Sequence, residues 1–435
     1  MSGTHSGSAT AGGLPARAAA QAVLSEVLRK RRPLDLALES MRALPPRDAG
    51  FARAIATETL RRFGQIEALV RHFVPKSLPP HKSGPALEIL FAGACELLFL
   101  DVPAHAAVDA ANRLAQTDAK ARHFKSLINA VLRRVTREGR DVLAAQDAAR
   151  LNTPDWLWDR WRAAFGEDIA CAIAAAHLQQ PPVDIVLKHA GASAPAGEPL
   201  FGNVVRLKDA GRIDALPGFD QGEWWVQDAA ATLPVLLLGD VRGQRVIDLC
   251  AAPGGKTMQL GAAGALVTAV ERDGVRLQRV QENLARTKLE AALVTSDARD
   301  FTPEAPAPFV LLDAPCTATG TIRRHPELPW IKSAADVTLC ERGASELLDA
   351  AAQMVAPGGV LVFAVCSLEP EEGPEQAQVF LARDARFSRE PVQPGEVFGH
   401  AEWINAEGDL RTLPCHLGGS GGMDGFYAAR FRRVV

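Results

Sequence analysis

The sequence contains no apolar run long enough to cross a lipid bilayer, so we expect no membrane partner and no membrane-spanning helix. The opening residues, MSGTHSGSATAGG, lack the apolar core of a signal peptide and predict a disordered tail over 1–13. Seven cysteines, an odd number, are scattered along the chain, and none forms a CxxC pair or a cysteine–histidine cluster with zinc-ligand spacing. These absences predict a reducing, cytoplasmic location, no disulfide framework and no structural metal.

Acidic residues are the minority among the charged residues of the first part of the chain, and basic residues are the minority in the rest. Residues 1–141 hold 21 Lys and Arg against 13 Asp and Glu, a net charge of +8. The whole chain has a net charge of −3, which leaves −11 for the remainder. A basic module joined to an acidic one suggests a nucleic-acid partner for the first, although a solvated helical surface explains the charge equally well. A length of 435 residues predicts two or three domains.

Helical periodicity dominates residues 14–145. Apolar residues recur at helical spacing in ARAAAQAVLSEVLRK, in DAGFARAIATETLRRFGQIEALVRHFV and in FKSLINAVLRRVTREG. The segment ALEILFAGACELLFL is apolar nearly all round, which is typical of a buried helix. We therefore predict an all-helical domain over 14–145, with Arg133, Arg134 and Arg137 on the polar side of its last helix.

The character of the chain changes twice after this domain. Residues 146–225 predict a helical connector that ends in Pro-Pro and then a small mixed α+β subdomain, with strand-like runs in VDIVLKH, VVRLK and EWWVQD. Over 226–435, strand candidates RVIDLC, ALVTAVE, ALVTSD, FVLLD and GVLVFAVC alternate with helical segments. That order predicts an α/β domain with a parallel, doubly wound sheet, closed by a strand pair in GDLRTLP and GMDGFYAARFRR.

The stretch VIDLCAAPGGKT, residues 246–257, ends like a nucleotide-phosphate loop. A phosphate loop needs Gly-x-x-x-x-Gly-Lys-Thr, but Cys250 stands where the first glycine belongs, and its Cβ disfavours a positive φ. Pro253 also removes one N–H donor from the expected cradle. A nucleoside pocket at the end of the first strand is the preferred interpretation, and a P-loop NTPase with FVLLD as its metal-binding strand is the minority alternative.

Acidic residues follow the strands of the predicted sheet. Glu271 ends the second strand, Asp297 follows the third, and Asp313 ends the fourth. Carboxyl ends of parallel strands meet at one edge, where ligands of doubly wound sheets bind and where an acid holds ribose hydroxyls. An acid after a strand is by itself usually a helix cap, so the argument depends on all three together.

Two cysteines lie at the same predicted edge. Cys316 follows the fourth strand in DAPCTATG, and Cys366 ends the fifth in AVCSLEPEE. For Cys95, Cys171, Cys340, Cys250 and Cys415 we expect buried structural cysteines. This interpretation fits Cys316 and Cys366 poorly, because both lie at strand ends in polar, proline-flanked loops. A thiolate that adds to carbon 6 of a cytosine makes carbon 5 nucleophilic toward a methyl sulfonium, and a second thiol could assist release of the product. The residues alone do not say which cysteine has which role.

The segments DLCAAPGGKT, DAPCTATGTIRRHPE, CSLEPEE and DGFYAARF resemble the bacterial ribosomal-RNA small-subunit methyltransferase B (Sun/Fmu) family of NOP2/Sun RNA cytosine-C5 methyltransferases. LNTPDWL and WWVQDAAA also resemble family segments, so the likeness covers nearly the whole chain. It implies a NusB-like RNA-binding domain over 14–145 and a Rossmann-like class I methyltransferase domain over 226–435. The implied activity is S-adenosylmethionine-dependent methylation of cytosine C5 in small-subunit (16S) ribosomal RNA by a monomer.

The resemblance also implies residue roles. Cys366 would be the nucleophile, Cys316 the thiol that helps to release the product, and Asp313 a residue between cofactor and cytosine. Glu271 would hold the ribose of S-adenosylmethionine and Asp297 its adenine. The loop that would wrap the cofactor consists of Cys250, Ala251, Ala252, Pro253, Gly254, Gly255 and Lys256. The family usually has Asp in place of Glu271 and Thr in place of Val365.

Arg323, Arg324 and His325 lie beside the expected cytosine site, and we interpret them as phosphate contacts, with a solvated loop as the alternative. The base would have to be flipped out or single-stranded. A non-catalytic RNA-binding or antitermination factor remains the third functional hypothesis, because the helical half alone would be compatible with it.

Overall fold

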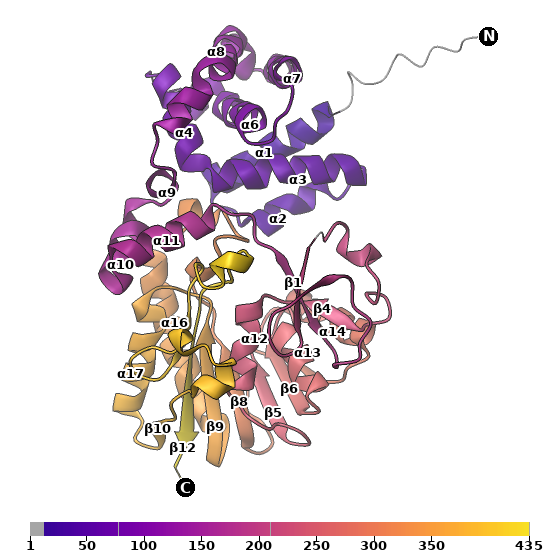
Figure 1. Ribbon diagram of the computed structural model, residues 1–435, viewed down its shortest axis with the longest axis vertical. Helices are drawn as coiled ribbons and strands as arrows, with labels where there is room; N and C mark the ends of the chain where they lie inside the picture. The colour runs from indigo at the N-terminus through magenta and orange to yellow at the C-terminus, as the bar shows by residue number, and fades with distance from the viewer. Residues whose placement is uncertain (1–12, 77, 209, 435) are drawn as a thin grey trace, which may run out of the picture. The chain divides into compact units, whose positions relative to one another are not determined.

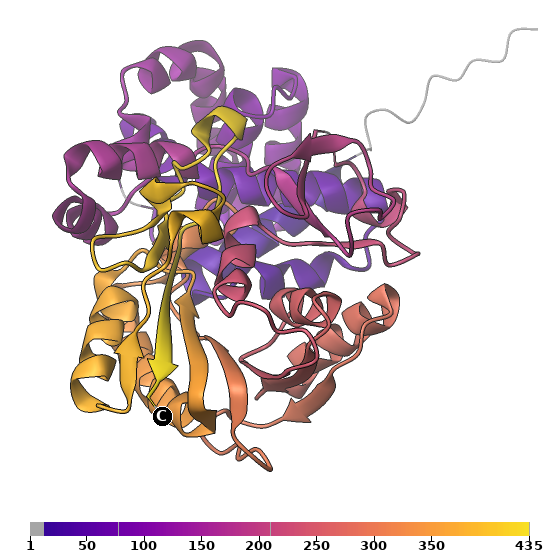
Figure 2. The same ribbon diagram turned by 60° about the horizontal axis from the view of Figure 1, so that its bottom comes forward.

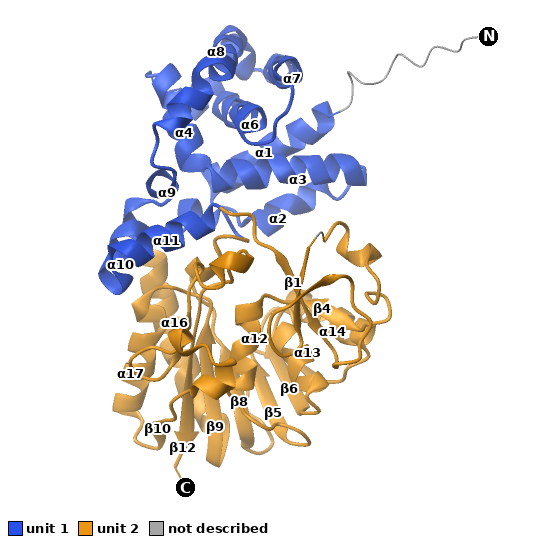
Figure 3. Ribbon diagram, viewed as in Figure 1, with its two compact units in different colours: residues 1–178, 325–332 blue, residues 179–324, 333–435 orange. Residues whose placement is uncertain are grey.

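The computed structural model describes residues 13–76, 78–208 and 210–434, and these divide into two compact units (Figure 3). One unit contains the described residues up to Leu178 and the short segment His325–Lys332. The other contains the described residues of Gln179–Arg324 and those from Ser333 onward. Residues 146–225 are thus divided between the units, and residues 1–12 of the expected tail lie outside the described part of the chain.

The first unit is helical, as the periodicity predicts. Its core surrounds α6 (Ala86–Leu98), which is buried on nearly all sides and packs against α3 (Pro46–Arg61), α4 (Phe63–Phe73), α7 (Ala104–Thr117) and α8 (Lys125–Ala144) (Figure 1). The remaining helices are α1 (Leu14–Lys30), α2 (Leu34–Leu38), α5 (Pro80–Ser83), α9 (Ala148–Leu151), α10 (Asp155–Phe165), α11 (Glu167–His177) and α15 (Leu328–Ile331).

A close backbone approach fixes one helix of this unit. A Cβ at Gly64, in the first turn of α4, would lie 1.8 Å from the carbonyl oxygen of Leu151 at the end of α9. Glycine is therefore needed there for steric reasons. The neighbouring side chains of Gln65 and Asn152 are also joined, by a 3.0 Å hydrogen bond from the Asn152 amide.

The second unit begins with a small antiparallel sheet of order β2-β3-β1-β4. Its strands are β1 (Val183–Leu187), β2 (Gly197–Pro199), β3 (Val204–Leu207) and β4 (Trp224–Val226). The sequence pattern correctly locates β1, β3 and β4. It misses β2, whose sequence Gly-Glu-Pro has no strand propensity and is ordered by pairing with β3.

The main sheet has the order β10-β12-β9-β8-β5-β6-β7, with β11 paired to β12. The parallel strands are β5 (Arg245–Leu249), β6 (Leu266–Glu271), β7 (Ala292–Thr295), β8 (Ala307–Asp313) and β9 (Val355–Val365). The antiparallel strands are β10 (Phe387–Arg389), β11 (Leu410–Thr412) and β12 (Phe426–Arg433), and Figure 2 shows β12, in yellow, beside the orange β9. The predicted doubly wound sheet and its closing strand pair are confirmed.

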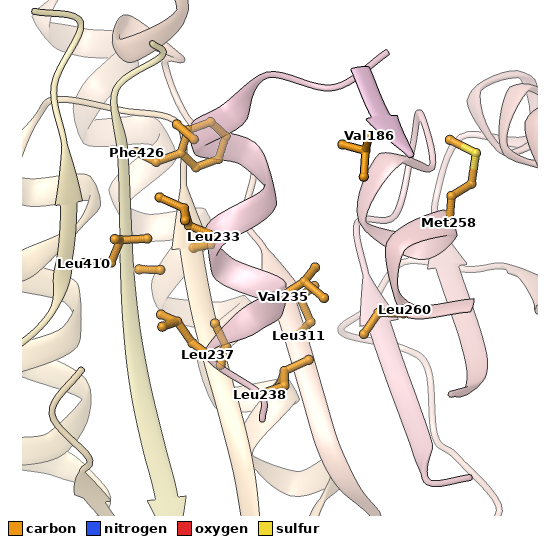
Figure 4. Packing of buried hydrophobic residues seen from close by; sticks show 14 of the residues in the cluster. Val186, Leu233, Val235, Leu237, Leu238, Met258, Leu260, Leu311, Leu410 and Phe426 are labelled. Atoms are coloured by element: carbon orange, nitrogen blue, oxygen red, sulfur yellow. The ribbon is translucent and has the colours of Figure 1, made fainter. Parts of the chain in front are cut away.

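Each face of this sheet has its own core, because side chains alternate along a strand. Val246 and Leu311 face one core with α12 (Ala229–Leu236), α13 (Gly255–Ala262) and α14 (Gly274–Thr287). Figure 4 shows α12 between Leu410 and Phe426 on one side and Met258 on the other. On the opposite face, Ile247 and Leu312 pack with α16 (Ala334–Met354) and α17 (Pro374–Arg383). In the described residues, no helix is both long enough and apolar enough to cross a membrane.

Candidate active site

The carboxyl ends of the parallel strands open onto a cavity of about 360 Å³. Glu271 at the end of β6, Asp297 after β7 and Cys250 after β5 all line it. The three strand ends therefore meet as the topology requires. The volume lies within the range of small-molecule pockets.

The loop between β5 and α13 is held by the strand and helix that follow it in the sequence. The Ala252 N–H donates to Glu271 Oε2 at 3.3 Å, and the Ala251 N–H donates to the Val270 carbonyl at 3.1 Å. Asn283 on α14 donates to the carbonyl of Pro253 at 3.1 Å. Cys250 has φ of +61°, so tertiary packing imposes the conformation that its Cβ disfavours. Gly254, at φ of +103°, is the N-cap residue of α13.

The Lys and Thr of the Gly-Gly-Lys-Thr sequence are bound to acids of the sheet. Lys256 Nζ lies 2.7 Å from Asp313 Oδ2, and the Thr257 hydroxyl donates to Asp248 Oδ2 at 2.6 Å. In a phosphate loop these two groups would be directed at phosphate oxygens and Mg²⁺. Their engagement by carboxylates therefore argues against the P-loop alternative.

The carboxylates of Glu271 and Asp297 both line the cavity, but they differ in burial and in hydrogen-bond partners. Glu271 is buried, and its Oε1 accepts a hydrogen bond from the Asp273 N–H at 3.1 Å. Both oxygens of Asp297 accept from the Arg299 guanidinium, at 2.9 and 2.8 Å. These hydrogen bonds lower the pKa of Asp297 to about 2, so its carboxylate is ionised at neutral pH.

The two candidate thiols lie side by side. Cys316 Sγ is 3.5 Å from Cys366 Sγ, although 50 residues separate them in the sequence. The hydrogen bond with Cys366 and burial raise the pKa of Cys316 well above its usual range. The Gly320 N–H donates to the Cys366 carbonyl at 3.0 Å, which ties the two cysteine-bearing loops together.

Lys256 at the start of α13 and Asp313 at the end of β8 form a polar pair. The Lys256 ammonium lies 5.0 Å from the centroid of the Phe426 ring, within the range of a cation–π contact. Asp313 remains half-buried with its carboxylate at the end of β8. An ammonium and a carboxylate in contact can stabilise charge of either sign that develops on a bound base.

The expected phosphate contact and the solvated loop are both wrong for Arg323. For Arg324, whose side chain is 24% exposed, a phosphate contact stays a prediction. Arg323 is completely buried and lies 3.3 Å from Asp424 and 3.6 Å from Asp228. Arg324 pairs with the same two aspartates, at 2.5 and 3.0 Å. Both arginines thus form a buried ion-pair cluster. His325 belongs to the helical unit, where its Nδ1 lies 3.7 Å from Glu327.

The cavity wall includes residues that the sequence pattern does not reveal. One side of α16 contributes Leu339, Cys340, Gly343 and Leu347. Cys340 is therefore a half-buried wall residue and not simply a buried hydrophobe, while Cys171, expected to be buried, is exposed on α11. Cys95 is buried as expected. Only the path of α16 over the sheet brings its residues to the cavity, and no local motif records that path.

The fold and the site together define the class of the protein, the Rossmann-like methyltransferases that take S-adenosylmethionine as cofactor. Acids at successive strand ends fit the hydroxyls and amino groups of a nucleoside, and small residues in the loop after β5 let the backbone approach it. In the described residues, no cluster of three or more His, Cys, Asp or Glu side chains could hold a metal ion.

Comparisons with known proteins give the family. A model described as 16S rRNA methyltransferase RsmB/F matches residues 235–432, and a NusB family model matches residues 14–137. Ribosomal RNA small subunit methyltransferase B of Pasteurella multocida is 32% identical over 446 residues, which covers 97% of each chain. The protein of the same name from Pseudomonas putida is 35% identical over 451 residues, covering 96% of this chain and 98% of that one.

Two solved structures share the fold. The crystal structure of PH0851 superposes with a TM-score of 0.74 at 21% identity and covers 96% of this chain and 99% of that one. The structure of NSun6 from Pyrococcus horikoshii with SFG has a TM-score of 0.52 at 19% identity, over 65% of this chain and 98% of that one. The chain belongs to the ribosomal RNA small subunit methyltransferase B family, whose members are S-adenosylmethionine-dependent rRNA methyltransferases.

Proposed function

We propose that the protein methylates carbon 5 of a cytosine in small-subunit (16S) ribosomal RNA through a covalent adduct with Cys366. The observation that carries this proposal is the pair of thiols, 3.5 Å apart, next to Pro315, which lines the same cavity as the carboxylates of Glu271 and Asp297. The names of the relatives support the RNA class. The resemblance to the NOP2/Sun family implies cytosine, and the thiol pair suits this base, since its carbon 5 needs a nucleophile on carbon 6 before it can accept a methyl group.

S-adenosylmethionine, when bound, supplies the electrophilic methyl group. The loop from Cys250 to Lys256 would wrap it, Glu271 would hold its ribose hydroxyls, and Asp297 would accept a hydrogen bond from the amino group of its adenine. Asp297 is suited to this role because it is ionised and fixed by Arg299.

The reaction begins when the Cys366 thiolate adds to carbon 6 of the cytosine. The electron pair displaced to carbon 5 would then form a bond to the methyl carbon, whose bond to the sulfonium sulfur breaks and leaves its electron pair on that sulfur. The pair of Asp313 and Lys256 would lie on the N3 side of the ring, where a proton donated by the pair would neutralise the negative charge that develops there. Cys316, which has to be deprotonated for this step, then takes the proton from carbon 5. The electron pair of that C–H bond re-forms the double bond between carbons 5 and 6, and the bond between carbon 6 and Cys366 breaks with its electron pair on the Cys366 sulfur.

Cys316 is assigned to this release step, and Cys366 to the attack. This order follows the roles that the resemblance to the NOP2/Sun family implies. After carbon 6 has bonded to Cys366, the neighbouring Sγ of Cys316 is close enough to reach the adjacent carbon 5.

Replacement of each cysteine tests the proposal. Cys366→Ala should abolish methyl transfer to 16S RNA while S-adenosylmethionine still binds, and Cys316→Ala should accumulate a protein–RNA complex that survives denaturing electrophoresis. Cys171→Ala, at an exposed cysteine on α11, is the matched control and should retain full activity. Full activity of Cys366→Ala would refute the assignment, and methyl transfer by neither variant nor wild type would favour a non-catalytic RNA-binding factor.

The modified nucleotide can be identified independently. Bisulfite sequencing of ribosomal RNA from a strain that lacks the protein should show one cytosine converted to uracil that resists conversion in the parent strain. A methyl group lost from any other base would contradict the cytosine assignment. Comparison of naked RNA with the assembling particle as substrate, in the same assay, would identify the partner.

A further inference from the structure

Behind the two thiols lies a buried carboxylate that the reaction described above does not use. Glu372 ends the short 3-10 helix Pro370–Glu372 and is 1% exposed. A carboxylate so deeply buried is costly unless several donors satisfy it.

Three hydrogen bonds satisfy Glu372, and they come from two different loops. Oε1 accepts from the Thr317 N–H at 2.8 Å, and Oε2 accepts from the Thr317 hydroxyl at 2.6 Å. Oε2 also accepts from the Ser367 hydroxyl. Thr317 directly follows Cys316 in the loop after β8, and Ser367 directly follows Cys366 in the loop after β9. One carboxylate therefore holds the residue next to each thiol.

A second set of bonds fixes the direction of these donors. The Glu369 N–H donates to Ser367 Oγ at 3.0 Å, so the hydrogen of that hydroxyl is free to point at Glu372. Arg411 donates to the carbonyl of Ser367 at 2.7 Å. The Thr319 hydroxyl, which accepts from the Leu368 N–H at 3.0 Å, donates to Glu369 at 3.2 Å. The loop after Cys366 is thus held from several sides.

We propose that Glu372 is a positioning residue that sets the separation of the Cys316 and Cys366 thiols for the release step. This inference rests on the proposed function. Release requires Cys316 to reach carbon 5 while Cys366 is still bonded to carbon 6, so the two sulfurs must stay within the span of one carbon–carbon bond and its substituents. Displacement by about 1 Å can reduce a rate about 100-fold. Glu372 contacts neither sulfur and acts through Thr317 and Ser367.

Thr317 offers a matched pair of variants that separates hydrogen bonding from packing. Thr317→Val keeps the shape and loses the hydroxyl, whereas Thr317→Ser keeps the hydroxyl and loses only a methyl group. In the full-length protein, Thr317→Val should reduce kcat about tenfold and leave KM for S-adenosylmethionine within about twofold, because the cofactor cavity has other walls. It should also accumulate the covalent protein–RNA complex, as Cys316→Ala does, and Thr317→Ser should restore turnover. Thr287→Val, at an equally buried threonine whose hydroxyl bonds within α14, controls for the loss of a buried hydroxyl.

Glu372→Gln provides a stronger perturbation and a direct measure of the thiol separation. The amide has one acceptor oxygen and directs an NH₂ group at donors, so the loops should separate. Diamide takes two electrons and two protons from a thiol pair, and in the wild type it should form a disulfide between Cys316 and Cys366. Peptide mapping should show that this disulfide forms more slowly in Glu372→Gln and in Thr317→Val. Disulfide formation at the wild-type rate in Glu372→Gln and Thr317→Val would overturn the positioning role. An equal loss of activity in Thr317→Ser and Thr317→Val would overturn it as well. If Cys316→Ala itself traps no RNA while disulfide formation slows as expected, the release chemistry has failed and the positioning has not.

Discussion

Replacement of Arg323 by alanine should destabilise the protein without loosening a contact to RNA phosphate. The Arg323 guanidinium is 1% exposed and lies between Asp228 and Asp424, and it also donates to the Gly421 carbonyl at 2.7 Å. Arg324 pairs with the same two aspartates, so two cations balance two anions in the interior. Removal of Arg323 leaves one buried negative charge without a partner.

The expected cost is about 3–5 kcal/mol, the usual penalty for breaking a buried ion pair on one side only. For a domain of this size that corresponds to a fall in Tm of about 10 °C. Circular dichroism during heating measures it. Arg212→Ala, which removes an exposed arginine that pairs with Asp214, is the control and should leave Tm unchanged. Asp424→Asn in the Arg323→Ala background should recover part of the loss, because it removes the uncompensated charge.

RNA affinity at several salt concentrations completes the test. The buried cluster predicts that folded Arg323→Ala keeps the wild-type dependence of Kd on salt. An unchanged Tm together with a salt dependence reduced by about one ion would refute the reasoning and restore the phosphate contact.

Three further predictions concern other sites. Burial raises the pKa of Asp248 to about 7, so the stability that its protonated form contributes is present below about pH 4 and is lost as the pH rises through 7. In urea unfolding, the free energy of unfolding of the wild type should fall by about 4 kcal/mol between pH 4 and 8, and that of Asp248→Asn should not show this fall. Glu271→Ala should weaken S-adenosylmethionine binding at least about tenfold in calorimetry, since this carboxylate also accepts the Ala252 N–H and so holds the loop after β5. The affinity for RNA should stay unchanged. Glutamates in place of Arg133 and Arg137, exposed one turn apart on α8, should weaken RNA binding and flatten its salt dependence, and an unchanged Kd would argue against RNA on this helix.

Local patterns predicted the strand ends well because they depend on short-range physics. Apolar runs locate β5, β6, β8 and β9, and an acid or cysteine next in the sequence must then lie at the carboxyl edge. The same patterns misjudged Arg323, because its partners Asp228 and Asp424 are each about 100 residues away. They misjudged Cys171 because an apolar helix segment does not say which of its faces is covered.

The sequence by itself determined the class of the fold, the order of the two modules and the place of the loop after β5, since periodicity and the residues at strand ends depend only on neighbours in the sequence. The tertiary structure alone decided which distant groups meet. It brings Cys316 to within 3.5 Å of Cys366, adds α16 to the cavity wall, and places Glu372 where one carboxylate holds both cysteine loops. These contacts depend on how β8, β9 and the segments after them pack. Burial and charge pairing between residues so far apart in the chain produce no periodic pattern in the sequence.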